Sequence, residues 1–233
     1  MPAILPAWTD ADPALHARLT DAIDPDRKIL GALERVVPLS GKRIADIGTG
    51  LGHYPMLLAR RTGRTYGVES DPELLAEARR RTTAMHQPNI RIVEGEPTRL
   101  PLRDGAVDIV LTGGIAPDDG ALPAIAEAVR VIRPGGRLIV IGYYGRDDVA
   151  SLLEPEVVAQ VMEATQRRTG WWLRNGFKIK VVHARVDLAD PELAHELLPR
   201  LYGDRGRAYL MGPHRPFLRL NLGLYHREVP DRA

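Results

Sequence analysis

The stretch that decides the fold is Asp46-Ile47-Gly48-Thr49-Gly50-Leu51-Gly52, in which three glycines alternate with other residues directly after the short apolar run 42–47. The run predicts a strand, and a helical pattern resumes at 56–58, so the glycines form a loop between a strand and a helix. Glycines there let the backbone pass close to a ligand lying across the carboxyl end of the strand. The loop therefore predicts a ligand site, with a tight packing turn as the alternative.

The residues around the glycines indicate which ligand suits the loop. A dinucleotide fingerprint has the spacing G-x-G-x-x-G, and His53 stands where its third glycine would be. Asp46, two residues before the first glycine, suits a cationic ligand and would repel a pyrophosphate. An NAD-binding protein is therefore disfavoured.

Strand and helix patterns alternate along the chain. Asp24 with Pro25 predicts the start of a helix, and Ser70 with Glu73 has the spacing of a capping box. Strands are expected at 42–47, 65–68, 90–93, 107–112, 137–141, 177–186 and 217–225, and helices at 14–22, 25–37, 72–85, 122–132, 154–168 and 191–201. Such alternation predicts a parallel sheet with helices on both faces, in a single domain.

Later segments match the expectations raised by the loop. Tyr66-Gly67-Val68-Glu69 ends a strand on an acid, 23 residues after Asp46, close to the roughly 20 residues expected between a glycine loop and a ribose-binding carboxylate. With 93–101, 106–111 and 131–138 following in order, the sequence resembles the class I S-adenosylmethionine (SAM)-dependent methyltransferases. The resemblance implies an α/β fold with a Rossmann-like, doubly wound, mostly parallel seven-stranded sheet and an antiparallel last strand.

The resemblance covers residues 42–143 and implies SAM as the cofactor. Glu69 would accept from both ribose hydroxyls, and Glu96 would contact the adenine amine. The cofactor-binding residues expected from the resemblance are Asp46, Gly48, Thr49, Gly50, Gly52, Glu69, Ser70, Glu96, Pro97 and Thr112. Pro97 departs from the family pattern, because it stands where a backbone N–H reaches an adenine nitrogen. Leaving that nitrogen unpaired would cost about 1 kcal/mol or more.

Composition excludes several other kinds of site. The 233 residues contain no cysteine, which removes disulfides, thiolate nucleophiles and zinc-thiolate sites and indicates the cytoplasm. No apolar run approaches the roughly 18 residues of a membrane span, so no membrane partner is expected. The net charge is only +2, and the basic excess of the C-terminal third is too diffuse to demand nucleic acid.

The sequence does not identify the catalytic residue that would take a proton from a methyl acceptor. The candidate bases are His53, His183 and His214, but none has a partner visible in the sequence, and an isolated histidine is more often a surface or core residue. Trp171 and Trp172 indicate either an aromatic anchor for a helix-to-strand turn or the floor of an acceptor pocket.

Two further groups of polar residues have a structural and a functional interpretation. Asp118 and Asp119 indicate a helix cap more than a metal site, and no metal is predicted. A Gly/Arg-rich stretch is expected to form a loop after residue 201. The residues that would form its solvated face, or bind an anionic acceptor or RNA phosphate, are Arg200, Tyr202, Arg205, Arg207, Tyr209 and Arg215.

The sequence thus predicts a SAM-dependent methyltransferase acting on a small molecule. Residues 1–41 are expected to form N-terminal helices and a lid, 42–143 the SAM-binding half, and 144–233 the rest of the sheet and substrate-side insertions. One alternative is an RNA methyltransferase, suggested by the basic C-terminal third. Another is a non-catalytic SAM-binding module, suggested by Pro97 and the lack of an identified base. The acceptor and the oligomeric state are not predicted.

Overall fold

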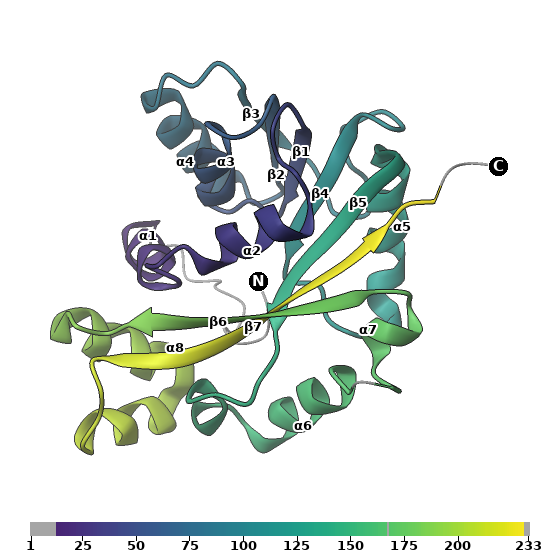
Figure 1. Ribbon diagram of the computed structural model, residues 1–233. Coiled ribbons are helices and arrows are strands. Elements are labelled where there is room, and N and C mark those ends of the chain that lie inside the picture. Colours follow the sequence, from purple (N-terminus) through teal and green to yellow (C-terminus); the bar gives the residue numbers. More distant parts are fainter. Residues whose placement is uncertain (1–12, 167, 231–233) are drawn as a thin grey trace.

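The computed structural model describes residues 13–166 and 168–230, and these form a seven-stranded sheet (Figure 1). The strands are β1 (Arg43–Ile47), β2 (Arg64–Glu69), β3 (Ile90–Glu94), β4 (Val107–Gly113), β5 (Ile132–Tyr143), β6 (Lys178–Asp187) and β7 (Phe217–Glu228). They lie in the order β3-β2-β1-β4-β5-β7-β6, with parallel pairing from β3 to β5. Because β7 runs antiparallel to β5 and β6, the predicted fold class is confirmed, antiparallel last strand included. The described residues exclude 1–12, 167 and 231–233. The predictions for the segments 1–41, 154–168 and 144–233 lie outside the described residues at these positions.

Helices cover both faces of the sheet. One face carries α1 (Pro13–Ala22), α2 (Lys28–Val36), α3 (His53–Leu58) and α8 (Pro191–Met211), with α4 (Pro72–Ala84) beside α3. The other face carries α5 (Leu122–Val131) and α7 (Trp171–Arg174). Three short helices complete the connections: η1 (Asp119–Ala121), η2 (Val149–Leu152) and α6 (Pro155–Ala164). Among the described helices, none has the length and apolar character needed to cross a bilayer.

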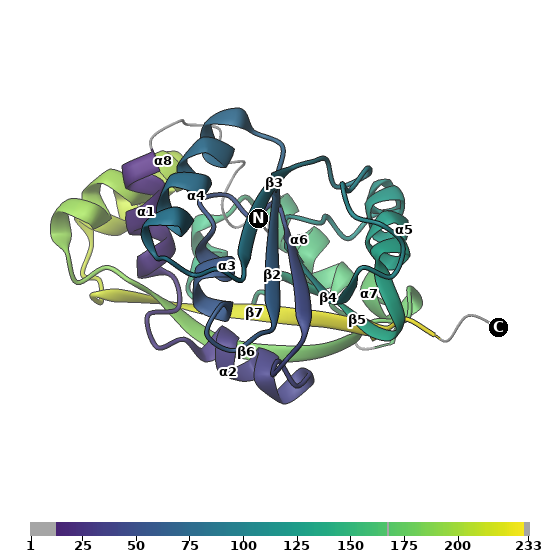
Figure 2. The ribbon, with the colours of Figure 1, turned by 90° about the horizontal axis from the view of Figure 1, so that it is seen from above.

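The N-terminal helices contact the insertion between β6 and β7. The Arg18 guanidinium pairs with Glu196 at 2.9 Å and with Asp190 at 3.2 Å, which joins α1 to α8. The Asp24 amide donates to the Arg185 carbonyl at 3.0 Å, which joins the segment between α1 and α2 to β6. Figure 2 shows α1 and α8 together, away from α5 and α7. Two segments at opposite ends of the chain therefore form one side of the molecule.

The helix predicted after Asp24 begins later than expected. Asp24 and Arg27 both adopt left-handed backbone conformations, with φ of 56° and 54°, so the chain turns before α2 begins at Lys28. Pro25 consequently lies outside the helix. Asp24 still caps α2, because its two carboxylate oxygens accept from the amides of Lys28 and Ile29 at 2.9 and 2.7 Å.

The helix cap predicted at Ser70 is wrong by one residue. The Asp71 carboxylate accepts from the amides of Glu73 and Leu74, both at 2.9 Å, and Pro72 occupies the first helical position. The reason is that proline suits the position after the cap, where no amide is needed. The cap predicted at Asp118 is confirmed, since its carboxylate accepts from the Gly120 amide at 2.9 Å.

Three other element boundaries differ from the sequence prediction. Residues 134–136, which the sequence prediction left between the helix at 122–132 and the strand at 137–141, belong to β5, which pairs irregularly with β4 there. The helix expected over 154–168 ends at Ala164. The loop expected after residue 201 is a continuation of α8 to Met211, because a kink at Gly203 (φ 56°, ψ −131°) joins two helical segments.

The cap at Asp24 leads to a stability prediction. Replacement by alanine removes both capping bonds, so Asp24→Ala should lower the free energy of unfolding by about 1 to 2 kcal/mol in urea denaturation. Asp24→Asn should cost less, because asparagine tolerates the left-handed conformation and keeps an acceptor oxygen. Asp26→Ala is the matched control, since Asp26 is exposed and contributes only surface ion pairs. Equal losses in Asp24→Ala and Asp26→Ala would contradict the capping role.

Candidate functional site

The carboxyl ends of four parallel strands open onto one cavity. Its volume is about 1890 Å³, and its wall contains the glycine loop after β1, Glu69 at the end of β2, Thr112 at the end of β4 and Tyr143 at the end of β5. Small-molecule sites typically measure roughly 300 to 1,000 Å³, so this cavity has room for more than one small molecule. The edge of an α/β sheet at which it lies is where such folds bind ligands.

Glu69 fixes the glycine loop against the end of β2. One carboxylate oxygen accepts from the Gly50 amide at 2.7 Å, and the other accepts from the amides of Ser70 and Asp71 at 2.9 and 3.1 Å. Gly50 has a φ of 55°, a conformation that side chains rarely adopt. A carboxylate has about four acceptor positions. Three are taken by backbone amides, so one remains for a ligand hydroxyl where the sequence predicted bonds to two.

Asp46 is a buried acid in the wall of the same cavity. Its carboxylate accepts from the Thr49 hydroxyl at 2.7 Å, and only 3% of the residue is exposed. Burial raises the pKa of Asp46 to about 7, against the effect of the Thr49 hydrogen bond. A cation near Asp46 would favour the ionised form, so the site suits a positively charged ligand.

A smaller hollow of about 280 Å³ adjoins the main cavity and shares Gly48 and Thr112 with it. Pro97 lines this hollow, close to the end of β4. The Thr112 hydroxyl is held by the Ile47 carbonyl at 3.1 Å, which leaves its oxygen free to accept. Of the two residues that the resemblance assigned to the adenine end of the cofactor, Pro97 lines this hollow and Glu96 does not.

The structure does not place every predicted cofactor residue in a cavity wall. Gly52 caps α3 with a φ of 77°, and a Cβ there would lie 3.3 Å from the Thr82 side chain, so its local role is close packing. Ser70 and Glu96 are exposed and lie outside the walls of both cavities. A role for these three residues in cofactor binding stays a prediction.

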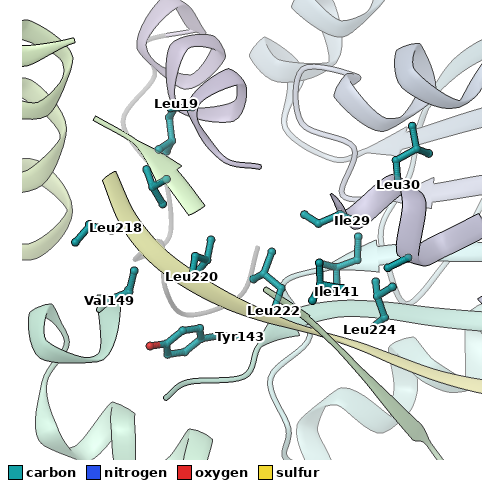
Figure 3. Packing of buried hydrophobic residues seen from close by; sticks show 14 of the residues in the cluster. Leu19, Ile29, Leu30, Ile141, Tyr143, Val149, Leu218, Leu220, Leu222 and Leu224 are labelled. Carbon is teal, nitrogen blue, oxygen red and sulfur yellow. The ribbon is translucent and has the colours of Figure 1, made fainter. Parts of the chain in front are cut away.

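The cavity continues from the glycine loop into an apolar chamber. Figure 3 shows part of its wall, where Leu19, Ile29, Ile141, Leu220 and Leu222 extend from α1, α2, β5 and β7. Side chains of α8 close the chamber from the opposite side. The chamber wall therefore combines the N-terminal helices and the insertion between β6 and β7 with residues of β5 and β7.

A polar pair lies at one end of the apolar chamber. Tyr143 lines the cavity, and its hydroxyl donates to Asp147 at 2.6 Å. Asp147 also accepts from the amides of Ala150 at 3.1 Å and of Asn221, and burial raises the pKa of its carboxyl. Because the Tyr143 proton is directed at Asp147, the phenol oxygen presents lone pairs to a ligand hydroxyl.

The three histidines proposed as bases have different surroundings. His53 is in the cavity wall, and burial lowers its pKa. His183 is exposed, with its ring 2.7 Å from the Asn221 side-chain oxygen, and exposed His214 is 2.9 Å from the Gly212 carbonyl. Neither lies in the cavity wall, so the structure retains one of the three as a candidate.

The two tryptophans anchor a helix-to-strand turn, as one of the two predictions has it, and a role in an acceptor pocket stays a prediction. The Trp172 ring stacks on Tyr225 with a centroid distance of 4.2 Å and meets Phe177 edge-on at 5.2 Å, which anchors the start of β6. The Trp171 indole donates to Asp119 at 3.0 Å. Both tryptophans also line the cavity.

The basic residues of the C-terminal third are distributed among ion pairs. Arg205 pairs with Glu154 at 3.1 Å and Arg207 with Asp204 at 2.6 Å. Arg215 lies over the Phe217 ring. Within the described ranges, no three acidic or histidine side chains gather as metal ligands.

The residues of the cavity wall that sequence reasoning missed include His16, Arg81 and Tyr143. His16 is 6% exposed, and its Nε2 lies 3.5 Å from the position that a Cβ on Gly50 would occupy. No motif marks these residues, because each reaches the cavity only through the packing of its helix or strand. Only Tyr143 had a signal in the sequence, namely its position at the end of β5. This strand pairs with β4, which in turn pairs with β1, the strand before the glycine loop.

Comparisons with known proteins agree with this geometry. Residues 44–136 match the family model described as a methyltransferase domain. A demethylmenaquinone methyltransferase of Deinococcus radiodurans is 30% identical over 168 residues, which cover 56% of this chain and 69% of that protein. An uncharacterized 37.1 kDa protein in a transposon of Streptomyces fradiae is 33% identical over 176 residues, 73% of this chain and 45% of that protein. The chain spans about half the length of most of the curated relatives it matches.

Solved structures share the same architecture. A SAM-dependent methyltransferase from Aquifex aeolicus superimposes with a TM-score of 0.54 at 18% identity, over 93% of this chain and 98% of that chain. The fold is thus that of class I methyltransferases. With the family match and the Deinococcus relative, the chain belongs to the class I SAM-dependent methyltransferases.

SAM is the cofactor of this family, and the described residues suit it. The buried Asp46 carboxylate suits a cationic ligand, Glu69 keeps one acceptor position, and the backbone at Gly50 leaves a surface without a side chain. When bound, SAM supplies an electrophilic methyl group on a positively charged sulfur.

The pKa of Asp46 predicts how cofactor affinity depends on pH. The folded-state pKa lies above the ordinary value, so the ionised carboxylate is fully present only above about pH 7. SAM is a cation at sulfur and its demethylated product S-adenosylhomocysteine (SAH) is not. The SAM affinity relative to that of SAH should therefore rise several-fold between pH 6 and 8, measured by calorimetry. Asp46→Asn should make the ratio independent of pH, whereas a flat ratio in the unaltered protein would contradict the charge assignment.

Proposed function

We propose that this protein transfers a methyl group from SAM to a small-molecule acceptor with a large apolar body. The observation that carries the proposal is that the glycine loop and the apolar chamber belong to one continuous cavity. Acceptor and cofactor would share this space. Holding the acceptor atom about 3 Å from the methyl carbon and in line with it would supply much of the rate.

The chamber supports an apolar acceptor in preference to a polar polymer. Its aliphatic wall gains most by contact with a hydrophobic ligand, at roughly 25 cal/mol for each Å² removed from water. Several relatives are demethylmenaquinone methyltransferases, and a quinone ring is an apolar body of the kind this wall would contact. The ion pairs of Arg205 and Arg207 leave the RNA alternative without a concentrated basic surface to support it. The cytoplasmic location expected from the sequence stays a prediction.

Tyr143 and Asp147 supply the group that a hydroxyl acceptor would need. The phenol oxygen would accept a hydrogen bond from the acceptor hydroxyl while its own proton is directed at Asp147. As the acceptor oxygen gains the methyl group, its proton would pass to Tyr143 and the phenol proton to Asp147. The raised pKa of the Asp147 carboxyl favours that second transfer.

Calorimetry with SAM and SAH tests the cofactor claim. Glu69→Ala removes the bonds that hold the loop, and Gly50→Val places a branched side chain at a left-handed residue, so each should weaken binding at least tenfold. Glu73→Ala is the matched control, because Glu73 is an exposed acid on the adjoining helix and lies outside the cavity wall. Absence of binding at high micromolar SAH would defeat the proposal.

A labelled-methyl assay tests the acceptor claim and the role of Tyr143. We expect turnover with acceptors such as 1,4-naphthoquinol, and Tyr143→Phe should lower kcat roughly 10- to 100-fold, because general-base assistance is worth at least this much. SAH affinity should not change. Tyr144→Phe is the control, since Tyr144 lies outside the cavity wall. SAH binding without turnover on any acceptor would favour the non-catalytic module, and turnover on RNA alone would favour the RNA alternative.

A further inference from the structure

A cationic side chain in the cavity wall has a buried nitrogen without a hydrogen-bond acceptor. Arg81 lies near the end of α4, and its Nη1 is buried and makes no hydrogen bond to any described residue. Its neighbours on the helix have acceptors, because Arg79 donates to the Ile92 carbonyl at 3.4 Å and Arg80 donates to Glu77. A buried guanidinium N–H without an acceptor is costly, so a bound group that accepts there would be stabilised.

Three acids on the elements around Arg81 have other surroundings. Glu77 holds Arg80 through two bonds of 2.6 and 2.7 Å. Glu69 accepts from three backbone amides. Asp21, also in the cavity wall, is exposed to solvent. None of these acids hydrogen-bonds the buried Nη1 of Arg81.

Two histidines lie in the same part of the wall. His16 on α1 lies over Gly50, and His53 is the first residue of α3. Burial lowers the pKa of both imidazoles, and the Arg81 charge lowers them further, which places all three residues within electrostatic reach of one another. The cluster of Arg81, His16 and His53 therefore combines one fixed positive charge with two neutral rings that can each donate an N–H.

We propose that this cluster, the anion cluster, binds a carboxylate beside the glycine loop. The inference rests on the proposed function, because the cluster lines the same cavity as Glu69 and Gly50. A carboxylate accepts from a guanidinium in a charge-assisted geometry that water or a neutral carbonyl does not match. Two ligands carry such a group: the amino-acid end of the cofactor, or an acidic acceptor.

Two ligand pairs, each differing in the group that carries the carboxylate, distinguish a cofactor carboxylate from an acceptor carboxylate. SAH and 5′-deoxy-5′-methylthioadenosine share the nucleoside and the thioether, but only SAH has the amino-acid end. If the cluster binds the cofactor carboxylate, Arg81→Met should weaken SAH at least tenfold by calorimetry and change the affinity for methylthioadenosine less than twofold. Arg81→Lys should recover part of the loss, because it restores the charge without the fork geometry.

A second pair of ligands tests the acceptor as the source. With SAH saturating, decanoate and decan-1-ol differ only in the carboxylate. If the cluster binds an acceptor, the unaltered protein should prefer decanoate at least tenfold, and Arg81→Met should remove that preference without changing SAH affinity. Arg79→Met is the matched control for both pairs, because Arg79 lies on the same helix but outside the cavity wall.

The outcomes are distinguishable from failure of the proposed function. If the unaltered protein does not bind SAH, the proposed function fails before Arg81 is tested. The carboxylate assignment is overturned if the protein binds SAH but Arg81→Met leaves the relative affinities within both ligand pairs unchanged. It is also overturned if Arg81→Met lowers the affinities for SAH and methylthioadenosine equally. Thermal unfolding of each variant separates loss of binding from loss of folding.

Discussion

The hydrogen bonds of the Glu69 carboxylate are the constraint on which the site depends. One side chain at the end of β2 holds the amide of Gly50 in the glycine loop and the amides of Ser70 and Asp71 at the start of α4. Three segments are thereby fixed around a single negative charge. The position of Gly50 in turn sets where α1 can lie, because His16 packs directly over it. Glu69 thus connects the glycine loop to α1, which forms part of the chamber wall.

The sequence predicted the cofactor half of the fold well because its signals are local. Glycines in a loop and a capping aspartate act on residues a few positions away, and the acid at the end of β2 belongs to the same strand-helix-strand unit as the glycine loop. Asp46, Glu69 and Asp118 lie where those patterns placed them. The predictions failed where packing decides the outcome. The Gly/Arg-rich stretch around Gly203 suggested the end of a helix, but Gly203 forms a kink inside α8. The second half of α8 packs against the first half, and Gly206 faces the Leu198 carbonyl too closely for a side chain.

The sequence predicted which parts of the chain lie on the substrate side, but it did not predict which residues form the chamber, for a related reason. Its wall joins α1, near one end of the chain, to α8, near the other, and the ion pairs of Arg18 with Asp190 and Glu196 connect residues that have no relation in the sequence. Aliphatic residues such as Leu19 and Leu220 look like ordinary core residues until their elements are assembled. The roles proposed for Tyr143 and Arg81 follow only from the cavity that both residues line.

The long antiparallel ribbon of β6 and β7 has a consequence for how such proteins diversify. The ribbon carries α8 and one wall of the chamber, whereas the strands that hold the glycine loop and Glu69 lie across β5 from it. Side chains alternate between the two faces of a strand, so removing two residues from each ribbon strand would preserve which residues face inward. The length of the chamber wall can therefore change in steps of two residue pairs while the cofactor half stays as it is. Chamber size and the glycine loop thus depend on separate parts of the sheet.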